Sequence, residues 1–206
     1  MSIQLTTTKS SSYLWEPTQE VIEQSHMYQF ADFSNQALFP YDRFHRWSIT
    51  HIDEFWSNLW DYTNIIGDKG DTIFEENSSM VDARFFPNSK LNFAENLLRG
   101  KSEQIAAYEA DETGVTQSIT IGELRELVAK LQYSLKKIGV RKGDRVAGVT
   151  TNSIETLAAL LATASIGAVW TSCSPDFGTR GITDRIGQVE PKVLFTTLNY
   201  KYKLKE

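Results

Sequence analysis

The sequence predicts an α/β fold in which an aromatic-rich helical segment precedes a β-hairpin and a βαβαβ unit built on a parallel sheet. Apolar runs of strand length alternate with helical patterns between residues 144 and 197, as in folds whose parallel strands are linked by helices. Two strand-like runs flank the turn "DETG" at residues 111–114. Aromatic residues recur at helical spacing before residue 100, which predicts a helical core there.

The composition is that of a globular protein with a hydrophobic core. Of the 206 residues, 41% are hydrophobic and 23% are charged, and the formal net charge is −5. Because nucleic-acid binding favours a clustered basic surface, we expect no nucleic-acid partner. The single cysteine, Cys173, excludes an intrachain disulfide and a site made of several cysteines, and it predicts a cytoplasmic location.

No segment predicts a secretory signal or a membrane span. Residues 1–17 lack a basic segment followed by an apolar one. The stretch from Thr156 to Pro175 has no charge and is long enough to cross a bilayer, but serine and threonine lower its hydropathy and Gly167 divides it. We therefore expect a buried helix and a strand there, and no membrane partner.

The first half of the chain is expected to begin with a disordered leader over residues 1–12, which are rich in serine and threonine. Residues 13–100 then form a helical segment, with its clearest helix at 51–66, capped by Thr50 and ended by Gly67. The apolar residues of this helix recur at helical spacing: Ile52, Phe55, Trp56, Leu59 and Ile66. The histidines of the sequence lack metal-ligand spacing, so we expect no metal site.

Residues 101–206 are expected to start an α/β domain. A short helix before Gly100 leads to the hairpin, whose second strand feeds a helix that opens with the capping-box pair Thr120 and Glu123. The apolar stripe of that helix is Leu124, Leu127, Val128, Leu131, Leu135 and Ile138. Strands follow at 144–150, 168–173 and 192–197. Between them lie a buried helix opened by Asn152 and Glu155, and a helix around Ile182, Ile186 and Val189 that Pro191 stops.

Ligands of open parallel sheets bind outside the carboxyl ends of the strands. Those ends are "TTNS" (150–153), "CSPDFG" (173–178) and "TTLNY" (196–200). After the second strand, Thr179 is the expected cap of a helix whose positive end attracts an anion, with Arg180 and Arg185 nearby. Two interpretations stay open: an anion site, or a solvated helix start in which Asp176, Arg180, Asp184 and Arg185 pair with one another. Cys173 is expected to pack in the core rather than act as a nucleophile.

Four segments together resemble the acetoacetyl-CoA synthetases of the adenylate-forming acyl-CoA synthetase superfamily. They are "HRWSITHIDEFWSNLWDYTNIIG", "MVDARFFPNSKLNFAENLLRG", "GVRKGDRVAGVTTNSIETLAALLATASIGAVWTSCSPDFG" and "PKVLF". The resemblance runs from about Trp15 to the end. It implies a partial N-terminal domain of the adenylate-forming fold and an AMP-forming acid–thiol ligase that uses ATP, Mg²⁺, coenzyme A and acetoacetate. The family's phosphate loop, adenine and ribose motifs and catalytic lysine have no match, so the resemblance implies an N-terminal fragment, inactive without the remainder of its own chain.

The resemblance also implies a role for the loop after the second strand. Ser174, Pro175 and Asp176 match a loop that contacts coenzyme A, and Arg180 and Arg185 follow on the next helix. Arginines that hold the nucleotide phosphate in related enzymes fall on Tyr202 and Lys205, which leaves Lys201, Lys203 and Lys205 as substitutes. The alternatives are a synthetase for another short acyl chain and a non-catalytic module that binds an acyl-CoA or a protein.

Overall fold

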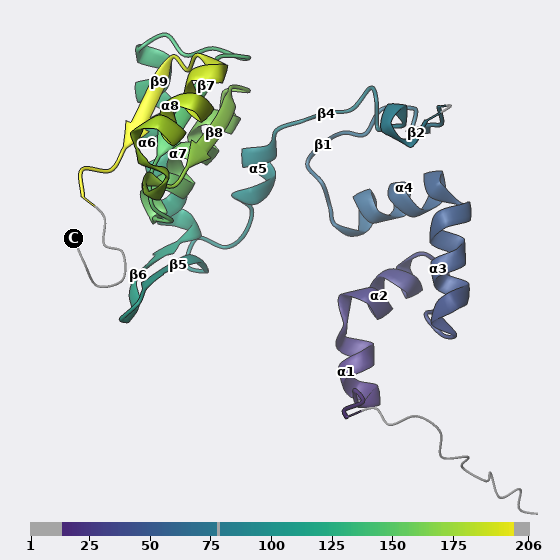
Figure 1. The fold of residues 1–206 in the computed structure, drawn as a ribbon. Helices are drawn as coiled ribbons and strands as arrows, with labels where there is room; N and C mark the ends of the chain where they lie inside the picture. The colour runs from purple at the N-terminus through teal and green to yellow at the C-terminus, as the bar shows by residue number, and fades with distance from the viewer. Residues whose placement is uncertain (1–13, 78, 200–206) are drawn as a thin grey trace, which may run out of the picture. The chain divides into compact units, whose positions relative to one another are not determined.

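The computed structural model describes residues 14–77 and 79–199, which fall into two compact units (Figure 1). Among the described residues, the first unit holds 14–65 and 69–88, and the second holds 66–68 and 89–199. The expected leader over residues 1–12 lies outside the described residues. The predicted division between residues 100 and 101 differs from this one by the segments 66–68 and 89–100, which lie in the second unit.

The first unit is helical and carries one pair of short strands in its described part. Its elements are α1 (Gln19–Gln24), α2 (His26–Phe33), α3 (Tyr41–Thr50), α4 (Ile52–Tyr62), β2 (Phe74–Glu75), the 3₁₀ turn η1 (Met80–Asp82) and β3 (Arg84–Phe85), with β2 antiparallel to β3. Phe30, Ala31, Leu38, Phe44 and Trp47 form its buried core. Phe55 and Leu59 of α4 pack against this core, which confirms the predicted helical aromatic core.

Two predictions about the ends of α4 are wrong. Thr50 ends α3 and does not cap α4, because its hydroxyl donates to the carbonyl of Arg46 at 2.8 Å. The helix ends at Tyr62, and Asn64 just beyond it adopts a left-handed φ of 52°. The chain has therefore already turned before it reaches Gly67, which belongs to strand β1.

The second unit contains two antiparallel strand pairs, helices and a parallel sheet. Its elements are β1 (Gly67–Asp68), β4 (Lys90–Leu91), α5 (Phe93–Leu97), β5 (Ile105–Asp111), β6 (Gly114–Thr120), α6 (Ile121–Lys137), β7 (Arg145–Val149), α7 (Ile154–Ser165), β8 (Val169–Cys173), the 3₁₀ turn η2 (Pro175–Phe177), α8 (Gly178–Ile186), the 3₁₀ turn η3 (Gly187–Val189) and β9 (Val193–Thr196). The strand β1 pairs with β4, and β5 pairs with β6. This order confirms the predicted hairpin and βαβαβ unit.

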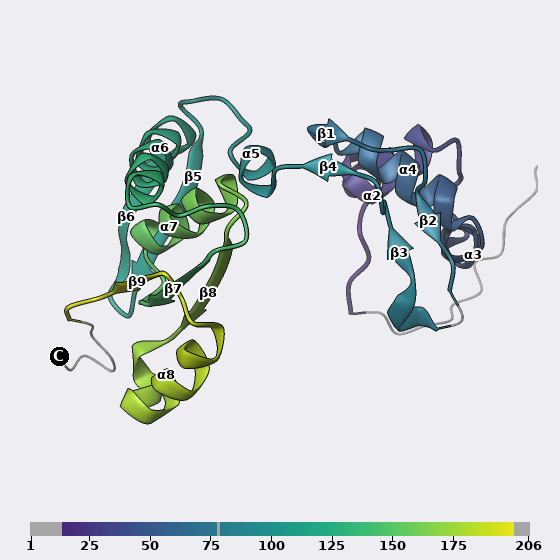
Figure 2. The ribbon, with the colours of Figure 1, turned by 90° about the horizontal axis from the view of Figure 1, so that it is seen from above.

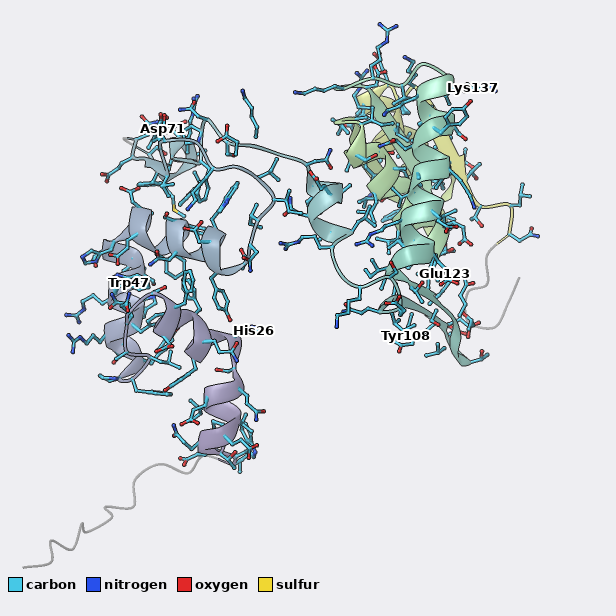
Figure 3. All side chains as sticks on the ribbon, turned by 180° about the vertical axis from the view of Figure 1, so that it is seen from behind. His26, Trp47, Asp71, Tyr108, Glu123 and Lys137 are labelled. Carbon is cyan, nitrogen blue, oxygen red and sulfur yellow. The ribbon has the colours of Figure 1, made fainter. Side chains whose placement is uncertain are left out.

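Helix α6 begins at the predicted capping box. The Thr120 hydroxyl accepts the Glu123 N–H at 3.2 Å, and the Glu123 carboxylate accepts the Thr120 N–H at 2.9 Å. The carboxylate also accepts the Thr120 O–H at 2.9 Å, and the hydrogen bonds from the Thr120 N–H first and from its hydroxyl second hold the pKa of Glu123 below its ordinary value. Figure 3 shows Glu123 and Lys137 at opposite ends of the helix. Ile138, predicted to continue the apolar stripe, is 60% exposed because it follows the last helical turn.

The three parallel strands lie in the order β8-β7-β9, with helices on both faces (Figure 2). Val146 of the central strand faces the core formed with α6 and α7, whereas Ala147 and Val149 pack against Ile186 of α8. Gly148 allows Trp170 of β8 to lie against the strand, since a Cβ at this position would be 2.7 Å from the indole ring. This alternation accounts for the near-continuous apolar sequence of β7.

The starts of α7 and α8 differ from the predicted ones. Ser153, rather than Asn152, caps α7 by accepting the Thr156 N–H at 3.2 Å. Thr179 lies inside α8, which follows directly on η2 and has no side-chain cap. The uncharged stretch beginning at Thr156 is α7 and β8, as predicted. Among the described helices, none is both long enough and apolar enough to cross a membrane.

Candidate functional site

A pocket of about 460 Å³ opens at the carboxyl ends of β7 and β8, where the strand order predicts a ligand site. The β7–α7 loop forms one wall and the segment after β8 forms the other. Its lining residues are Thr150, Thr151, Asn152, Thr156, Ser172, Cys173, Ser174, Pro175, Asp176 and Phe177. Most of these side chains are hydroxyls or amides, so the pocket can offer many neutral hydrogen-bonding groups.

The β7–α7 loop is held by hydrogen bonds to its neighbours. The Thr150 N–H donates to the Cys173 carbonyl of β8 at 3.4 Å. The hydroxyl of Thr156, in the first turn of α7, donates back to the Thr151 carbonyl at 2.9 Å. The Oγ1 atom of Thr150 is buried and has no hydrogen-bond partner among the described residues. A buried hydroxyl costs free energy when it is unpaired, and this one lies in a residue that lines the pocket.

The predicted residues Ser174, Pro175 and Asp176 do line the pocket. The Ser174 hydroxyl donates to Asp176 Oδ2 at 2.9 Å and accepts the Asp176 N–H at 3.3 Å. These two hydrogen bonds fix the conformation of the turn. Pro175 sits at the first position of η2, where a missing N–H costs nothing. Gly178 then takes a φ of 64°, a conformation that favours glycine and turns the chain into α8.

The structure does not bring Arg180 or Arg185 into this pocket. The Arg180 side chain is 97% exposed and lies 3.9 Å from Asp184 Oδ2. The Arg185 guanidinium lies 4.0 Å above the Phe177 ring and donates to the Gly181 carbonyl at 3.0 Å. The Arg180–Asp184 pair matches the solvated helix start that was one of the two interpretations. The remaining predicted residues, Lys201, Lys203 and Lys205, lie outside the described residues.

The charge of the pocket favours a neutral polar ligand group. None of the described residues that line it carries a positive charge, and Asp176 contributes a carboxylate. A phosphate requires cationic or N–H partners, so the pocket itself suits an amide, a hydroxyl or a thiol better. Cys173 packs against Ala147, Val149 and Ile186, which confirms its predicted packing role.

A second pocket of about 340 Å³ adjoins the first and shares three of its lining residues, Asn152, Thr156 and Ser172. The hairpin supplies its far wall through Tyr108 and Glu109. The end of its strand predicted the loop at 150–153, whereas no prediction of site residues included Thr156 or Glu109. Thr156 lies in the first turn of a helix, and Glu109 lies in a strand 45 residues before Ile154, which it contacts. No local sequence pattern therefore indicated that either residue lines a pocket.

No group of three or more potential metal-ligating side chains is present in residues 14–77 and 79–199. Two of the histidines instead form local hydrogen bonds in the first unit. His26 Nδ1 lies 3.0 Å from the Tyr62 hydroxyl, and His51 Nδ1 lies 3.0 Å from the Thr50 hydroxyl.

The parallel sheet, its flanking helices and the strand-end pocket define an α/β domain with a ligand-binding edge. The chain belongs to the AMP-binding enzyme family, whose model matches residues 95–206. A second family model, described as the acetyl-coenzyme A synthetase N-terminus, matches residues 41–97. The two matches meet at helix α5 and together span most of the described chain.

Within that family the chain is similar to acetoacetyl-CoA synthetases. It is 43% identical over 193 residues to the enzyme of Rhizobium meliloti, covering 92% of this chain, and 38% identical over 201 residues to that of Xenopus tropicalis, covering 94%. The solved acetoacetyl-CoA synthetase of Streptomyces lividans matches 95% of this chain with a TM-score of 0.85 and 38% identity, over 32% of its own chain. This match confirms the predicted fold class. The chain spans about 30% of the length of these curated relatives.

Proposed function

We propose that the chain is part of an AMP-forming acetoacetate–CoA ligase. In this reaction the acetoacetate carboxylate attacks the α-phosphorus of ATP, which forms an acyl-adenylate and releases pyrophosphate. The thiol of coenzyme A then displaces AMP and gives acetoacetyl-CoA. The observation that carries the proposal is the 43% identity to the R. meliloti acetoacetyl-CoA synthetase across 92% of this chain.

Within that enzyme we assign this segment to the coenzyme A side of the site. The neutral, hydroxyl-lined pocket beside Ser174, Pro175 and Asp176 suits the amide groups and thiol of the pantetheine arm. Arg180 and Arg185, which lie outside the pocket, and Lys201, Lys203 and Lys205 are the candidates for its phosphates. No described residue is assigned to ATP or Mg²⁺, whose binding belongs to the remainder of the enzyme. In the same proposal residues 13–100 are its N-terminal segment, residues 101–206 start its AMP-binding domain, and its location is cytoplasmic.

A different short acyl acid is the second candidate substrate. The chain is 42% identical over 168 residues to the malonamoyl-CoA synthetase of Penicillium aethiopicum, covering 78% of this chain and 23% of that protein. An identity this close to the 43% of the R. meliloti enzyme makes malonamate a competitor of acetoacetate.

Assay of the intact gene product with a panel of acids tests the proposal. ATP, Mg²⁺ and coenzyme A are supplied with acetoacetate, malonamate, acetate, propionate or butyrate, and AMP and thioester are measured together. We expect acetoacetate to give a kcat/KM at least about tenfold above acetate, propionate and butyrate, because its β-carbonyl is a polar group that can find a partner and adds at least this discrimination. A higher value with malonamate than with acetoacetate would select the second candidate. If acetoacetate yields no more AMP than acetate or butyrate, the substrate assignment is wrong.

A further inference from the structure

A carboxylate from the hairpin occupies the start of α7. Glu109 lies in β5 opposite Gln117 of β6, at an irregularity in the register that follows it. Such irregularities redirect side chains out of the regular ladder. A single oxygen, Glu109 Oε2, accepts the Ile154 N–H at 2.9 Å and the Gln117 side-chain N–H at 2.7 Å. Tyr108, the preceding residue, is 68% exposed, and Figure 3 shows it on the hairpin.

This contact fills a position that would otherwise attract an anionic ligand. The first N–H groups of a helix have no partner within the helix, and the dipole makes this end positive. In α7 the Ile154 N–H is taken by Glu109 and the Thr156 N–H is taken by Ser153. Two of the first N–H groups of α7 are therefore taken by side chains of the protein itself.

The contact also ties the loop that the two pockets share. Asn152 and Thr156 line both pockets, and Ile154 lies between them. One end of the loop is joined to β8 through the Thr150 N–H and the Cys173 carbonyl. The other end is joined to the hairpin through the hydrogen bond from the Ile154 N–H to Glu109. A shorter side chain at position 109 should therefore displace Asn152 and Thr156, which line both pockets.

We propose that Glu109 is a positioning residue that holds the 150–153 loop in place for coenzyme A. This inference rests on the proposed function for the ligand, but the contact between Glu109 and Ile154 does not. Glu109 has no assigned contact with the reacting atoms, so its effect should appear in the KM for coenzyme A and not in kcat.

Three variants separate reach from charge. Glu109→Gln keeps an acceptor oxygen at the same reach and removes the charge, Glu109→Asp keeps the charge and shortens the reach, and Glu109→Ala removes both. Glu126→Gln is the matched control, because Glu126 is exposed on α6 and lies 4.0 Å from Lys130, away from the loop. Hydrogen exchange of the Ile154 backbone amide is measured by NMR on this chain. Exchange of the Ala147 amide in the buried strand β7 shows whether each variant is folded. The Michaelis constants are measured on the intact gene product.

We expect the Asp and Ala variants to lose about tenfold in protection of the Ile154 amide and to raise the KM for coenzyme A about fivefold, the size of one hydrogen bond. The Gln variant and the Glu126→Gln control should stay within about twofold of the parent, because the first keeps the acceptor oxygen and the second leaves the Glu109–Ile154 hydrogen bond untouched. The proposal is overturned if Gln is impaired and Asp is not, because charge would then matter more than reach. It is also overturned if all three variants keep the parent KM. If the parent enzyme does not use coenzyme A, the proposed function fails, and the exchange series alone then decides whether Glu109 fixes the loop.

Discussion

At the scale of single residues, Asp144 links the strand starts at the edge of the sheet opposite the pocket. Its carboxylate accepts the Arg141 N–H at 2.8 Å and lies 3.0 Å from Lys192 Nζ, just before β9. The backbone hydrogen bond from Arg141 first, and then the hydrogen bond from Lys192, hold the pKa of Asp144 below its ordinary value. The native state therefore favours the ionised carboxylate more strongly than the unfolded chain does.

A pH dependence of stability follows from this lowered pKa. The stabilisation is fully present above the unfolded pKa of about 4 and is lost as the pH falls through the lower native value. We expect Asp144→Asn to be less stable than the parent at pH 7, with the difference shrinking below about pH 4. Urea unfolding at pH 7 and at pH 3 measures the difference in the free energy of unfolding between the variant and the parent.

Asp184→Asn is the control, because Asp184 forms an exposed pair with Arg180. Its free energy of unfolding should differ little from that of the parent at either pH. An Asp144→Asn effect of equal size at both pH values would contradict the assignment.

At the scale of elements, the capping box fixes where β6 ends and α6 begins. Replacing Thr120 by alanine removes the hydroxyl that accepts the Glu123 N–H. We expect the free energy of unfolding to fall by about 1 kcal/mol, the usual cost of losing such a cap. Ser134→Ala, in the same helix, should cost nothing or stabilise slightly, because alanine is the better helix former. Equal effects of the two substitutions on urea unfolding would show that the box does not matter.

The sequence predicted the order of helices and strands better than their ends. The strands β7, β8 and β9 were predictable because each is an apolar run of strand length, and α6 because one face is buried against the core. The starts of α4, α7 and α8 were not, because several neighbouring residues have capping side chains. In "TTNS", for example, Thr151, Asn152 and Ser153 can all cap a helix, and the tie from Glu109 to Ile154 favours Ser153.

The candidate site was predictable in part, for a related reason. Strand ends in a parallel sheet locate a ligand-binding edge, so the loops at 150–153 and 174–176 could be found from sequence. The distance between the arginines and the pocket could not, because it depends on the turn that η2 and Gly178 make before α8. Glu109 reaches the site from another supersecondary unit, and only the packed structure brings it to Ile154.

At the scale of the whole molecule, the chain belongs to the AMP-binding enzyme family, and we propose that its pocket serves coenzyme A. The chain spans about 30% of the length of its curated relatives, so the claim that can be tested through this chain is the coenzyme A role of its pocket. Asp176 is the residue whose replacement tests this role best, since it lines the pocket and accepts the hydrogen bond of the Ser174 hydroxyl.

The most direct measurement is the set of Michaelis constants of the intact gene product carrying Asp176→Ala, with coenzyme A, ATP and acetoacetate each varied in turn. We expect the KM for coenzyme A to rise about fivefold or more, because the loop loses the hydrogen bond that holds Ser174, and the constants for ATP and acetoacetate to stay within twofold. Glu126→Gln serves as the control for an exposed carboxylate. An unchanged KM for coenzyme A would contradict the account and leave the loop as a polar turn between a strand and a helix.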